Sequence, residues 1–358
     1  MKVGIVTIND NDNYGNRLQN YAVEQVLQKD GIKVKTLRNT IRFNNRCSKK
    51  VFVKKIIGHI YKDIIKNPLK NKKRLKAFKK FNRDNINFTR EMTTIFSKIN
   101  NKYDYFIVGS DQVWKPTYGR LSDMDVLAFA DSNKRIAFSA SFGISELDEN
   151  AKTKVKNEIS KFKSISVRED SGKKIIKDSI KREDIEVLVD PTMLLTSEEW
   201  DKVSKKPVML KTDKYILNYF LGELSEERKK EIDRIAKEND CEVINILDEN
   251  SPFYQTGPSE FLYLEKNAFL ICTDSFHSTV FSILYNRPFI VFNREDAKVN
   301  MNSRIETLMN KFDLNERYVK NHLINNNLLY WDYTKAYKIL EKEREKSKRF
   351  LEKALDIK

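Results

Sequence analysis

A short stretch around His277 carries residue types that suit acid catalysis on an anionic substrate. Thr273–Phe292, TDSFHSTVFSILYNRPFIVF, has the pattern of a strand end, a sharp turn, a helix and a second strand. Asp274 or Ser275 is a suitable N-cap for that helix, so His277 falls in its first turn. Backbone N–H groups in a first turn can bind an anion, and a histidine beside a phosphate or carboxylate can supply a proton. The alternative is a histidine that caps the helix or packs locally.

Residues of the same turn, and of one further helix start, would add donors to this anion site. Ser278 and Thr279 contribute hydroxyl groups. The sequence GPSEF repeats the helix-start pattern, in which Gly257 allows close approach and Ser259 can donate a hydrogen bond. A plain connection between a strand and a helix would also explain GPSEF. The predicted donor-binding residues are Ser275, Phe276, Ser278, Thr279 and Ser259.

Arg168, in SVRED, is the second candidate for a catalytic role. An arginine directly after a buried strand can point into a cleft, where its guanidinium can form a forked contact with a carboxylate or phosphate. The alternative is a salt bridge with Glu169 or Asp170, which follow it in the sequence.

The amino-terminal half carries polar residues that suit a sugar. Asp111 and Gln112, in VGSDQVW, could hydrogen-bond sugar hydroxyl groups, with Trp114 either as a stacking surface or as a core residue. Asn16 and Arg17 open the first predicted helix and could meet a hydroxylated or anionic ligand, although capping would also explain Asn16. The predicted acceptor-binding residues are Asn16, Arg17, Ser110, Asp111 and Gln112.

Strand and helix patterns alternate along the chain, which predicts a doubly wound, mainly parallel α/β fold. A strand over Lys2–Ile8, a helix over Arg17–Asp30 and a strand over Ile32–Leu37 form the first βαβ unit. The first strand is not followed by GxGxxG, which argues against a dinucleotide site. A second series of strands begins after residue 195, so two halves would face a cleft lined by strand ends. We expect Rossmann-like domains over residues 1–194 and 195–333 and a final helix over 334–358.

The positive charge of the chain is concentrated in one segment of the first half. The net charge is +16, and residues 46–83 hold 15 lysines and arginines against a single acid, Asp63. Apolar residues interleave at helical spacing, which predicts a basic amphipathic helix and a second helix after Pro68. This insert could bind an anionic membrane or a lipid-linked substrate, or it could be a solvated helical face. No nucleic-acid recognition motif accompanies the charge, so we expect no nucleic-acid partner.

Composition excludes several other classes of protein. No apolar run is long enough to span a bilayer, and the first residues lack the pattern of a signal peptide. Cys47, Cys241 and Cys272 are far apart, which favours free thiols in a reducing cytoplasm, and no Cys/His spacing indicates a metal site. We therefore expect a cytoplasmic protein, with peripheral attachment to the inner face of the plasma membrane as a further expectation. The oligomeric state is left open.

Several segments together resemble the polysaccharide pyruvyl transferase family. They occur in the family's order and cover roughly residues 1–310. The matching stretches are NYGNRLQNYAV (13–23), FIVGSDQVW (106–114), SASFG (139–143), SVRED (166–170), LVDPTMLL (188–195), YILNYFLG (215–222), GPSEFLYL (257–264) and TDSFHSTVFSILYNRPF (273–289).

The resemblance implies a GT-B-like fold of two domains and a specific reaction. Pyruvate would pass from phosphoenolpyruvate to two hydroxyl groups of one sugar in a cell-surface polysaccharide or a lipid-linked precursor, giving a cyclic ketal without metal or cofactor. His277 matches the family histidine assigned to donor binding and acid catalysis, and Arg168 matches the arginine thought to hold the donor. Ser275 stands where characterised members tend to have an arginine, and Ser278 where a glycine is common. The lost charge would have to come from Arg168 or from another cation, namely Arg17, Arg294 or Arg304.

Two other functions are compatible with the same sequence. A GT-B glycosyltransferase with a nucleotide-sugar donor would need an acid for the donor sugar, for which Asp248, Glu249 and Glu260 are candidates. A basic protein without enzymatic activity could instead bind anionic membranes or polymers through residues 46–83.

Overall fold

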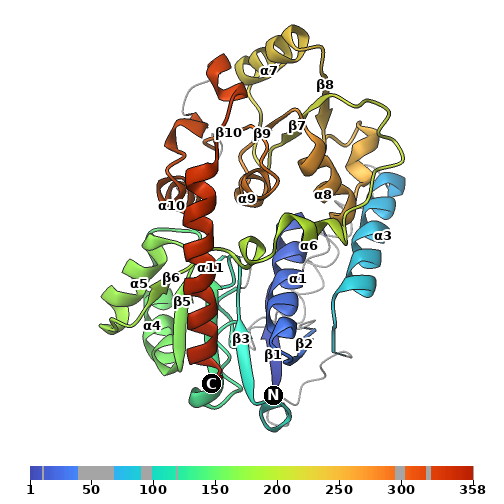
Figure 1. Cartoon of the computed structure of the whole chain (residues 1–358). Coiled ribbons are helices and arrows are strands. Elements are labelled where there is room, and N and C mark those ends of the chain that lie inside the picture. The colour runs from blue at the N-terminus through green and yellow to red at the C-terminus, as the bar shows by residue number, and fades with distance from the viewer. Residues whose placement is uncertain are drawn as a thin grey trace. The chain divides into compact units, whose positions relative to one another are not determined.

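The computed structural model contains two compact units (Figure 1). The first consists of Met1–Lys66, Arg83–Leu194 and Glu343–Lys358, and the second of Asn67–Asn82 and Leu195–Lys342. Each unit combines segments that are separated in the sequence. The predicted domain boundaries stay a prediction. The structure describes residues 1–9, 12–38, 68–89, 99–117, 120–294, 303–319 and 324–357.

The sheet of the first unit is parallel, with strand order β2-β1-β3-β4-β5-β6. The chain leaves β1 for β2 on one side and returns to β3 on the other, so the topological switch point lies between β1 and β3. The elements are β1 Lys2–Val6, α1 Tyr14–Lys29, β2 Lys33–Thr36, β3 Tyr105–Val108, β4 Arg135–Ala140, α4 Glu149–Glu158, β5 Ser164–Val167, α5 Asp170–Ile180 and β6 Glu186–Val187.

Both faces of this sheet are buried under helices, as the near-continuous apolar strands require. On one face Val3 and Ile5 of β1 share a hydrophobic cluster with Leu27 of α1 and with Phe350 of α11 (Thr334–Ala354). On the other face the cluster joins the sheet to α4 and α5, for example through Val155. The predicted doubly wound arrangement is therefore confirmed for this unit.

The sheet of the second unit is also parallel, with order β11-β10-β9-β7-β8 and a switch point between β7 and β9. α7 covers one face, where Ile232 and Ile235 pack with Ile216 of β7, and α8 and α9 contact each other. The two parallel sheets confirm the predicted α/β class. The elements are α6 Ser197–Asp201, β7 Tyr215–Tyr219, α7 Glu226–Glu238, β8 Glu242–Asn245, α8 Pro258–Asn267, β9 Leu270–Thr273, α9 Phe276–Leu284, β10 Phe289–Phe292, α10 Ser303–Phe312 and β11 Tyr318–Val319.

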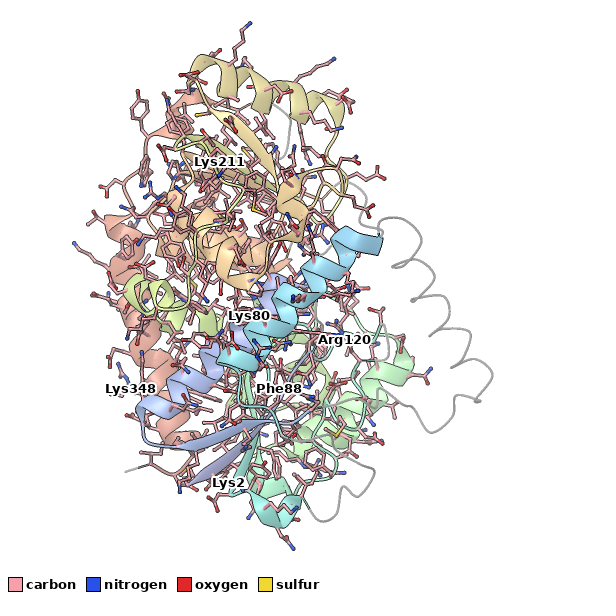
Figure 2. The ribbon with its side chains drawn as sticks, turned by 90° about the vertical axis from the view of Figure 1, so that its right-hand side faces the viewer. Lys2, Lys80, Phe88, Arg120, Lys211 and Lys348 are labelled. Atoms are coloured by element: carbon pink, nitrogen blue, oxygen red, sulfur yellow. The ribbon has the colours of Figure 1, made fainter. Side chains whose placement is uncertain are left out.

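The helix predicted after Pro68 is present as α3, Pro68–Asn85, whereas residues 46–67 of the basic insert lie outside the described part of the chain. Arg74 and Phe78 are buried, and the Arg74 guanidinium lies 5.2 Å from the ring centroid of Tyr254 and donates to its carbonyl oxygen at 3.1 Å. These contacts anchor α3 within the second unit. Five lysines are exposed, of which Lys80 is labelled in Figure 2: Lys72, Lys73, Lys76, Lys79 and Lys80.

The first helix begins three residues before its predicted start. The side chain of Asn13 accepts a hydrogen bond from the backbone N–H of Asn16 at 3.1 Å, so Asn13 is the N-cap and α1 begins at Tyr14. Capping therefore does not explain Asn16, which lies inside the first turn. Over the described ranges, no helix combines the length and the hydrophobicity needed to cross a bilayer.

Candidate active site

The switch point of the second sheet brings the loop after β7 beside the loop after β9. Asp274, directly after β9, accepts hydrogen bonds from the backbone N–H groups of Leu221 at 2.6 Å and Gly222 at 2.8 Å. Its Oδ2 also accepts from Nε of Arg294 at 3.0 Å. Asp274 is thus a structural carboxylate that joins the two loops and holds one guanidinium at this edge of the sheet.

His277 lies in the first turn of α9, as predicted, and its side chain is largely enclosed. The residue is 6% exposed, and its ring packs edge-on against Phe276, with 5.4 Å between ring centroids. The Arg304 guanidinium carbon lies 5.9 Å from the centroid of the same Phe276 ring. Two arginines of the second unit therefore flank this turn, Arg294 through Asp274 and Arg304 over Phe276. Both were among the cations proposed to replace the family arginine at Ser275.

Two of the hydroxyl groups predicted to bind the donor already form hydrogen bonds within the fold. Ser278 Oγ donates to Glu265 Oε1 at 2.5 Å, and Thr279 Oγ1 donates to the backbone oxygen of Ser275 at 2.9 Å. Ser259 is buried in the first turn of α8, where its backbone oxygen accepts from the Lys205 N–H at 3.0 Å. An anion at this turn would thus rely on backbone N–H groups and guanidinium groups rather than on these hydroxyls. Their assignment to donor binding stays a prediction.

Glu265 of α8 was not predicted and lies against the same turn. It is fully buried, and no described residue forms a hydrogen bond with its Oε2. Burial raises its pKa well above 4.5, and the hydrogen bond from Ser278 opposes this only in part. Burial therefore favours the neutral form of this carboxyl group. One signal was present in the sequence, since Glu265 follows Phe261 by one helical turn in the apolar stripe of FLYLEKN.

Arg168, in the first unit, is engaged by two carboxylates from other loops. Its Nη1 donates to Asp190 Oδ2 at 2.6 Å and its Nη2 donates to Asp111 Oδ1 at 3.0 Å. These partners differ from Glu169 and Asp170, which the sequence suggested. Burial lowers the pKa of Arg168, but the charges of Asp111 and Asp190 raise it, and the net direction is upward. The role of Arg168 as a donor anchor stays a prediction.

A hydrogen-bonded network surrounds this arginine at the carboxyl ends of the first sheet. Ser110 Oγ lies 2.9 Å from Asp190 Oδ2 and 2.8 Å from the backbone oxygen of Ser139. Gly109, with φ +128°, precedes it, and a Cβ there would lie 2.1 Å from the carbonyl oxygen of Phe138. The strand end therefore requires glycine. Ser110 and Asp111 both belong to this buried network, which holds the loop after β3 in place.

The remaining acceptor candidates divide into buried and accessible residues. Asn16 and Arg17 are buried within α1, and Arg17 Nη2 donates to the backbone oxygen of Ile8. Gln112 is partly exposed. Trp114 is fully buried and its Nε1 donates to the Asp125 backbone oxygen at 2.8 Å, so the core interpretation is correct and it is no stacking surface.

Within the described ranges, histidine, cysteine, aspartate and glutamate form no group of three or more that could hold a metal ion. The expectation that the chemistry requires neither metal nor cofactor stays a prediction.

Similarity to solved structures is broad in coverage but low in sequence identity. A UDP-GlcNAc 2-epimerase from Methanocaldococcus jannaschii is 16% identical, with a TM-score of 0.48 over 95% of this chain and 92% of that chain. A glycosyltransferase from Rickettsia africae is 13% identical, with a TM-score of 0.47 over 99% of this chain and 97% of that chain. No functionally curated protein matches the sequence.

The sequence matches a protein family over a long, continuous range. Residues 13–296 of the 358 match the polysaccharide pyruvyl transferase family. This range contains His277, Arg168 and every other predicted site residue. Because the match covers most of the chain, it establishes the family, and the chain belongs to the polysaccharide pyruvyl transferases.

Proposed function

We propose that this member of the family transfers pyruvate from phosphoenolpyruvate to two hydroxyl groups of one sugar residue in a cell-surface polysaccharide or its precursor, forming a cyclic ketal. The observation that carries the proposal is the turn at the switch point of the second sheet, where His277 packs against Phe276, Arg304 lies over the same ring, and Arg294 binds Asp274. Phosphoenolpyruvate carries two anionic groups and reacts when its C3 is protonated. A proton donor next to two guanidinium groups suits both needs.

The positive charge of the donor site would come mainly from Arg294 and Arg304. The Nε of Arg294 donates a hydrogen bond to Asp274, and no described residue accepts a hydrogen bond from the two terminal nitrogens of Arg294. Those nitrogens have the forked geometry that binds carboxylate or phosphate in a bidentate manner. They would compensate for Ser275, which stands in place of the family arginine. The backbone N–H groups at the start of α9 would add to the same potential.

The reaction then needs one proton donor and an ordered exchange of bonds. His277, in its imidazolium form, gives a proton to C3 of phosphoenolpyruvate, and positive charge develops at C2. A sugar hydroxyl attacks C2 and loses its proton. The bond between C2 and the phosphate oxygen then breaks, and phosphate leaves with the electron pair. The second hydroxyl attacks C2 and closes the ring. Of the two hydroxyl protons, one replaces the proton that His277 gave and the other leaves with phosphate. Side chains supply every charge required, so the proposal includes no metal or cofactor.

The acceptor sugar would meet polar residues at the carboxyl ends of the first sheet. Gln112 is the predicted acceptor residue with appreciable exposure, because Asn16, Arg17, Ser110 and Asp111 are buried. We propose that Gln112 contacts the sugar directly and that the buried residues fix the loop after β3. The pairing of Arg168 with Asp111 and Asp190 supports a positioning role within this loop.

The proposal is tested by phosphate release from phosphoenolpyruvate in the presence of a panel of polysaccharides and their oligosaccharide fragments. His277→Gln should lower kcat by about 10²–10⁴-fold, as expected for the loss of a general acid. Arg304→Ala should mainly raise the KM for phosphoenolpyruvate. Arg234→Ala, a surface arginine paired with Glu231 and Glu238, is the matched control and should leave both constants unchanged. Full phosphate release by His277→Gln would overturn the assignment of the acid.

Thermal unfolding with phosphoenolpyruvate and with nucleotide-sugars separates this reaction from a glycosyltransferase. Stabilisation by phosphoenolpyruvate alone supports the proposal, and stabilisation by a nucleotide-sugar alone would contradict it. Of the acids considered for a nucleotide-sugar donor, Glu260 accepts a hydrogen bond from the Gly257 N–H at 3.0 Å at the start of α8. That contact gives Glu260 a structural task at the start of α8.

The exposed lysines of α3 support a second part of the proposal, peripheral attachment to an anionic membrane at the inner face of the plasma membrane. Lys72, Lys76 and Lys80 are exposed on the helix whose buried face packs on the second unit. Sedimentation with anionic vesicles should decrease as salt rises, because screening weakens contacts between exposed charges. Charge-neutral vesicles serve as the control, and equal binding to both would contradict this part of the proposal.

A further inference from the structure

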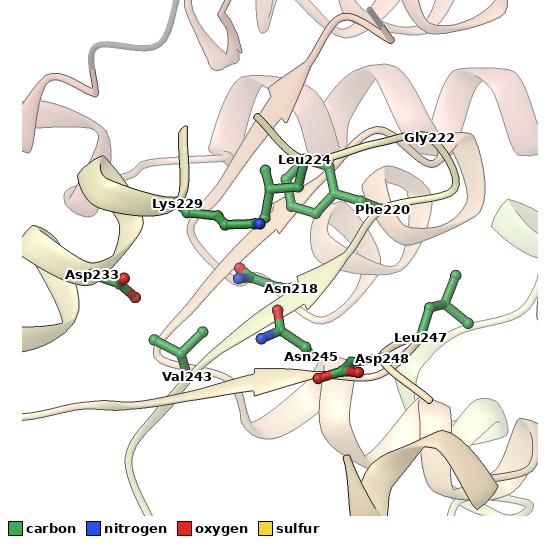
Figure 3. A pocket seen from close by; sticks show the side chains of 10 residues that line it. All are labelled: Asn218, Phe220, Gly222, Leu224, Lys229, Asp233, Val243, Asn245, Leu247 and Asp248. Carbon is green, nitrogen blue, oxygen red and sulfur yellow. The ribbon is translucent and has the colours of Figure 1, made fainter. Parts of the chain in front are cut away.

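A cavity of about 460 Å³ lies in the second unit at the carboxyl ends of β7 and β8 (Figure 3). Its size falls within the range of about 300–1,000 Å³ that is usual for small-molecule sites. The His277 turn follows β9, which pairs with β7 on the edge opposite to β8. None of the predicted donor-binding or acceptor-binding residues lines this cavity. It therefore needs an explanation of its own.

Two asparagines form the floor of the cavity. In the parallel register Ile216 pairs with Val243, and two residues further on Asn218 pairs with Asn245. Because side chains alternate along a strand, these pairs share one face of the sheet, which changes from apolar to amide at its edge. Ile216 belongs to the cluster under α7, where further apolar residues would be expected. Figure 3 shows both amides within the cavity.

Asn218 is the residue that most clearly implies a ligand. It is 5% exposed, and its buried Oδ1 has no hydrogen-bond partner among the described residues. Buried amides in proteins nearly always have a partner from protein, water or ligand. An amide carries both donors and an acceptor, and a hydroxyl group can donate to the one and accept from the other, so a ligand with hydroxyl groups suits an amide in this position.

The charges around the cavity disfavour an anionic ligand. Lys229 lines it, but its ammonium group donates to Glu226 at 2.5 Å. The hydrogen bond and charge of Glu226, together with the charge of Asp233, raise the pKa of Lys229. Asp233 and Asp248 bring two carboxylates to the lining. Lys229 stays charged but is paired with Glu226, and one lysine against Asp233 and Asp248 leaves the lining negative overall. This charge argues against phosphate, phosphoenolpyruvate or a sugar acid in the cavity.

The rest of the lining is apolar. Phe220 and Leu224 come from the loop after β7, and Leu247 from the loop after β8. Asp248 accepts from the Asn250 N–H through Oδ1, and its second oxygen has no hydrogen bond to a described residue. A neutral pyranose ring has both hydroxyl groups and C–H groups. The amides and the carboxylate can bind its neighbouring hydroxyls, and the apolar side chains can cover its C–H groups.

We infer that this cavity binds a neutral sugar residue, through the amides of Asn218 and Asn245 and the carboxylate of Asp248. The inference rests on the proposed function in one respect, which is that the bound sugar belongs to the acceptor glycan. It would be a different sugar residue of that glycan from the one that receives pyruvate. A second point of attachment would hold a long acceptor during the reaction at another of its residues.

The probes are neutral methyl glycosides of glucose, galactose, mannose and N-acetylglucosamine, with glucuronate and glucose 6-phosphate as charged counterparts. Binding to the full chain is measured by saturation-transfer NMR and by titration. The variants are Asn218→Ala/Asn245→Ala, which removes the amides, and Leu224→Trp, which fills the cavity and keeps them. Asn327→Ala, at an exposed asparagine of the same unit, is the matched control.

At least one neutral glycoside should bind more tightly than both charged sugars. Its affinity should fall at least tenfold in the amide variant and in Leu224→Trp, and should be unchanged in Asn327→Ala. Failure of every neutral glycoside to bind, or equal binding by wild type and both cavity variants, would overturn the inference. Phosphoenolpyruvate should stabilise all variants equally against heat, which confirms that they are folded. If phosphoenolpyruvate does not stabilise even the wild type, the proposed function is refuted, whereas the binding of a neutral sugar in this cavity is unaffected.

Discussion

Removing the guanidinium of Arg168 tests whether this arginine supports the first sheet or binds the donor. Its side chain is 1% exposed, and its partners Asp190 and Asp111 are 0% and 10% exposed. In Arg168→Met both carboxylates lose their counter-charge in a buried setting. Breaking a buried ion pair from one side costs about 3–5 kcal/mol, since the remaining charge stays desolvated. Asp190 keeps hydrogen bonds from Thr192 and Ser110, which offsets only part of that cost.

Urea unfolding of wild type and Arg168→Met gives the loss of stability directly. Arg234→Met, at a surface arginine, should cost at most about 1 kcal/mol, because exposed pairs contribute little. Adding Asp190→Asn and Asp111→Asn to Arg168→Met should recover part of the stability, since the uncompensated charges are then gone. That recovery distinguishes buried charge from a simple loss of packing.

The opposite pattern would refute the structural role of Arg168. If the free energy of unfolding of Arg168→Met is within about 1 kcal/mol of the wild-type value, the two carboxylates do not depend on the guanidinium. If the same variant also binds phosphoenolpyruvate at least tenfold more weakly, Arg168 holds the donor as the family resemblance implies. A loss of stability with an unchanged KM for phosphoenolpyruvate supports positioning instead.

Two further predictions concern Glu265 and Gly109. The folded-state pKa of Glu265 is raised, so its contribution to stability is complete below pH 4.5 and is lost as the pH rises toward the folded value. Glu265→Gln should therefore gain stability over the wild type by up to about 1.4 kcal/mol per pH unit above 4.5. Urea unfolding at pH 5 and pH 7 measures this gain, and a difference that does not change with pH would contradict it. Gly109→Ala should cost more than about 3 kcal/mol, since its Cβ would meet a backbone oxygen. Gly31→Ala, with φ +71° and open space, should cost about 1–2 kcal/mol, and equal losses for the two would contradict the steric explanation.

Strands and most helices were predictable because their apolar periodicity is local. The start of α1 was wrong by three residues, because the cap is a single hydrogen bond from the Asn16 N–H to the Asn13 side chain. Asn13 precedes Tyr14 and Gly15, neither of which favours a helix strongly, so the propensity signal began only later. The β11 strand was not predicted, since it has two residues and presents no periodicity. The α10 helix was not predicted either, although Ile305, Leu308 and Phe312 recur in it at helical spacing.

The candidate site was predictable only where one segment supplied it. His277 was found because a strand, a turn and a helix follow one another in sequence. Asp111 and Asp190 lie 57 and 22 residues from Arg168, and only the order of β3, β4, β5 and β6 brings those strand ends together. Glu265 was missed for the same reason, because it reaches Ser278 from a neighbouring helix. Such contacts depend on strand order and helix packing, which periodicity does not encode.

The two switch points differ in how their positive charge is used, and this difference bears on the loss of the family arginine at Ser275. Arg168 carries one positive charge between two carboxylates, so that cluster is negative overall and would repel a second anion. Arg294 shares its charge with the single carboxylate of Asp274, which two backbone N–H groups also stabilise. Arg304 contacts the face of Phe276. These charges favour the His277 turn over the Arg168 cluster as the proposed site for an anion with two charged groups, with the arginines after β10 as the proposed replacement for the family arginine at Ser275.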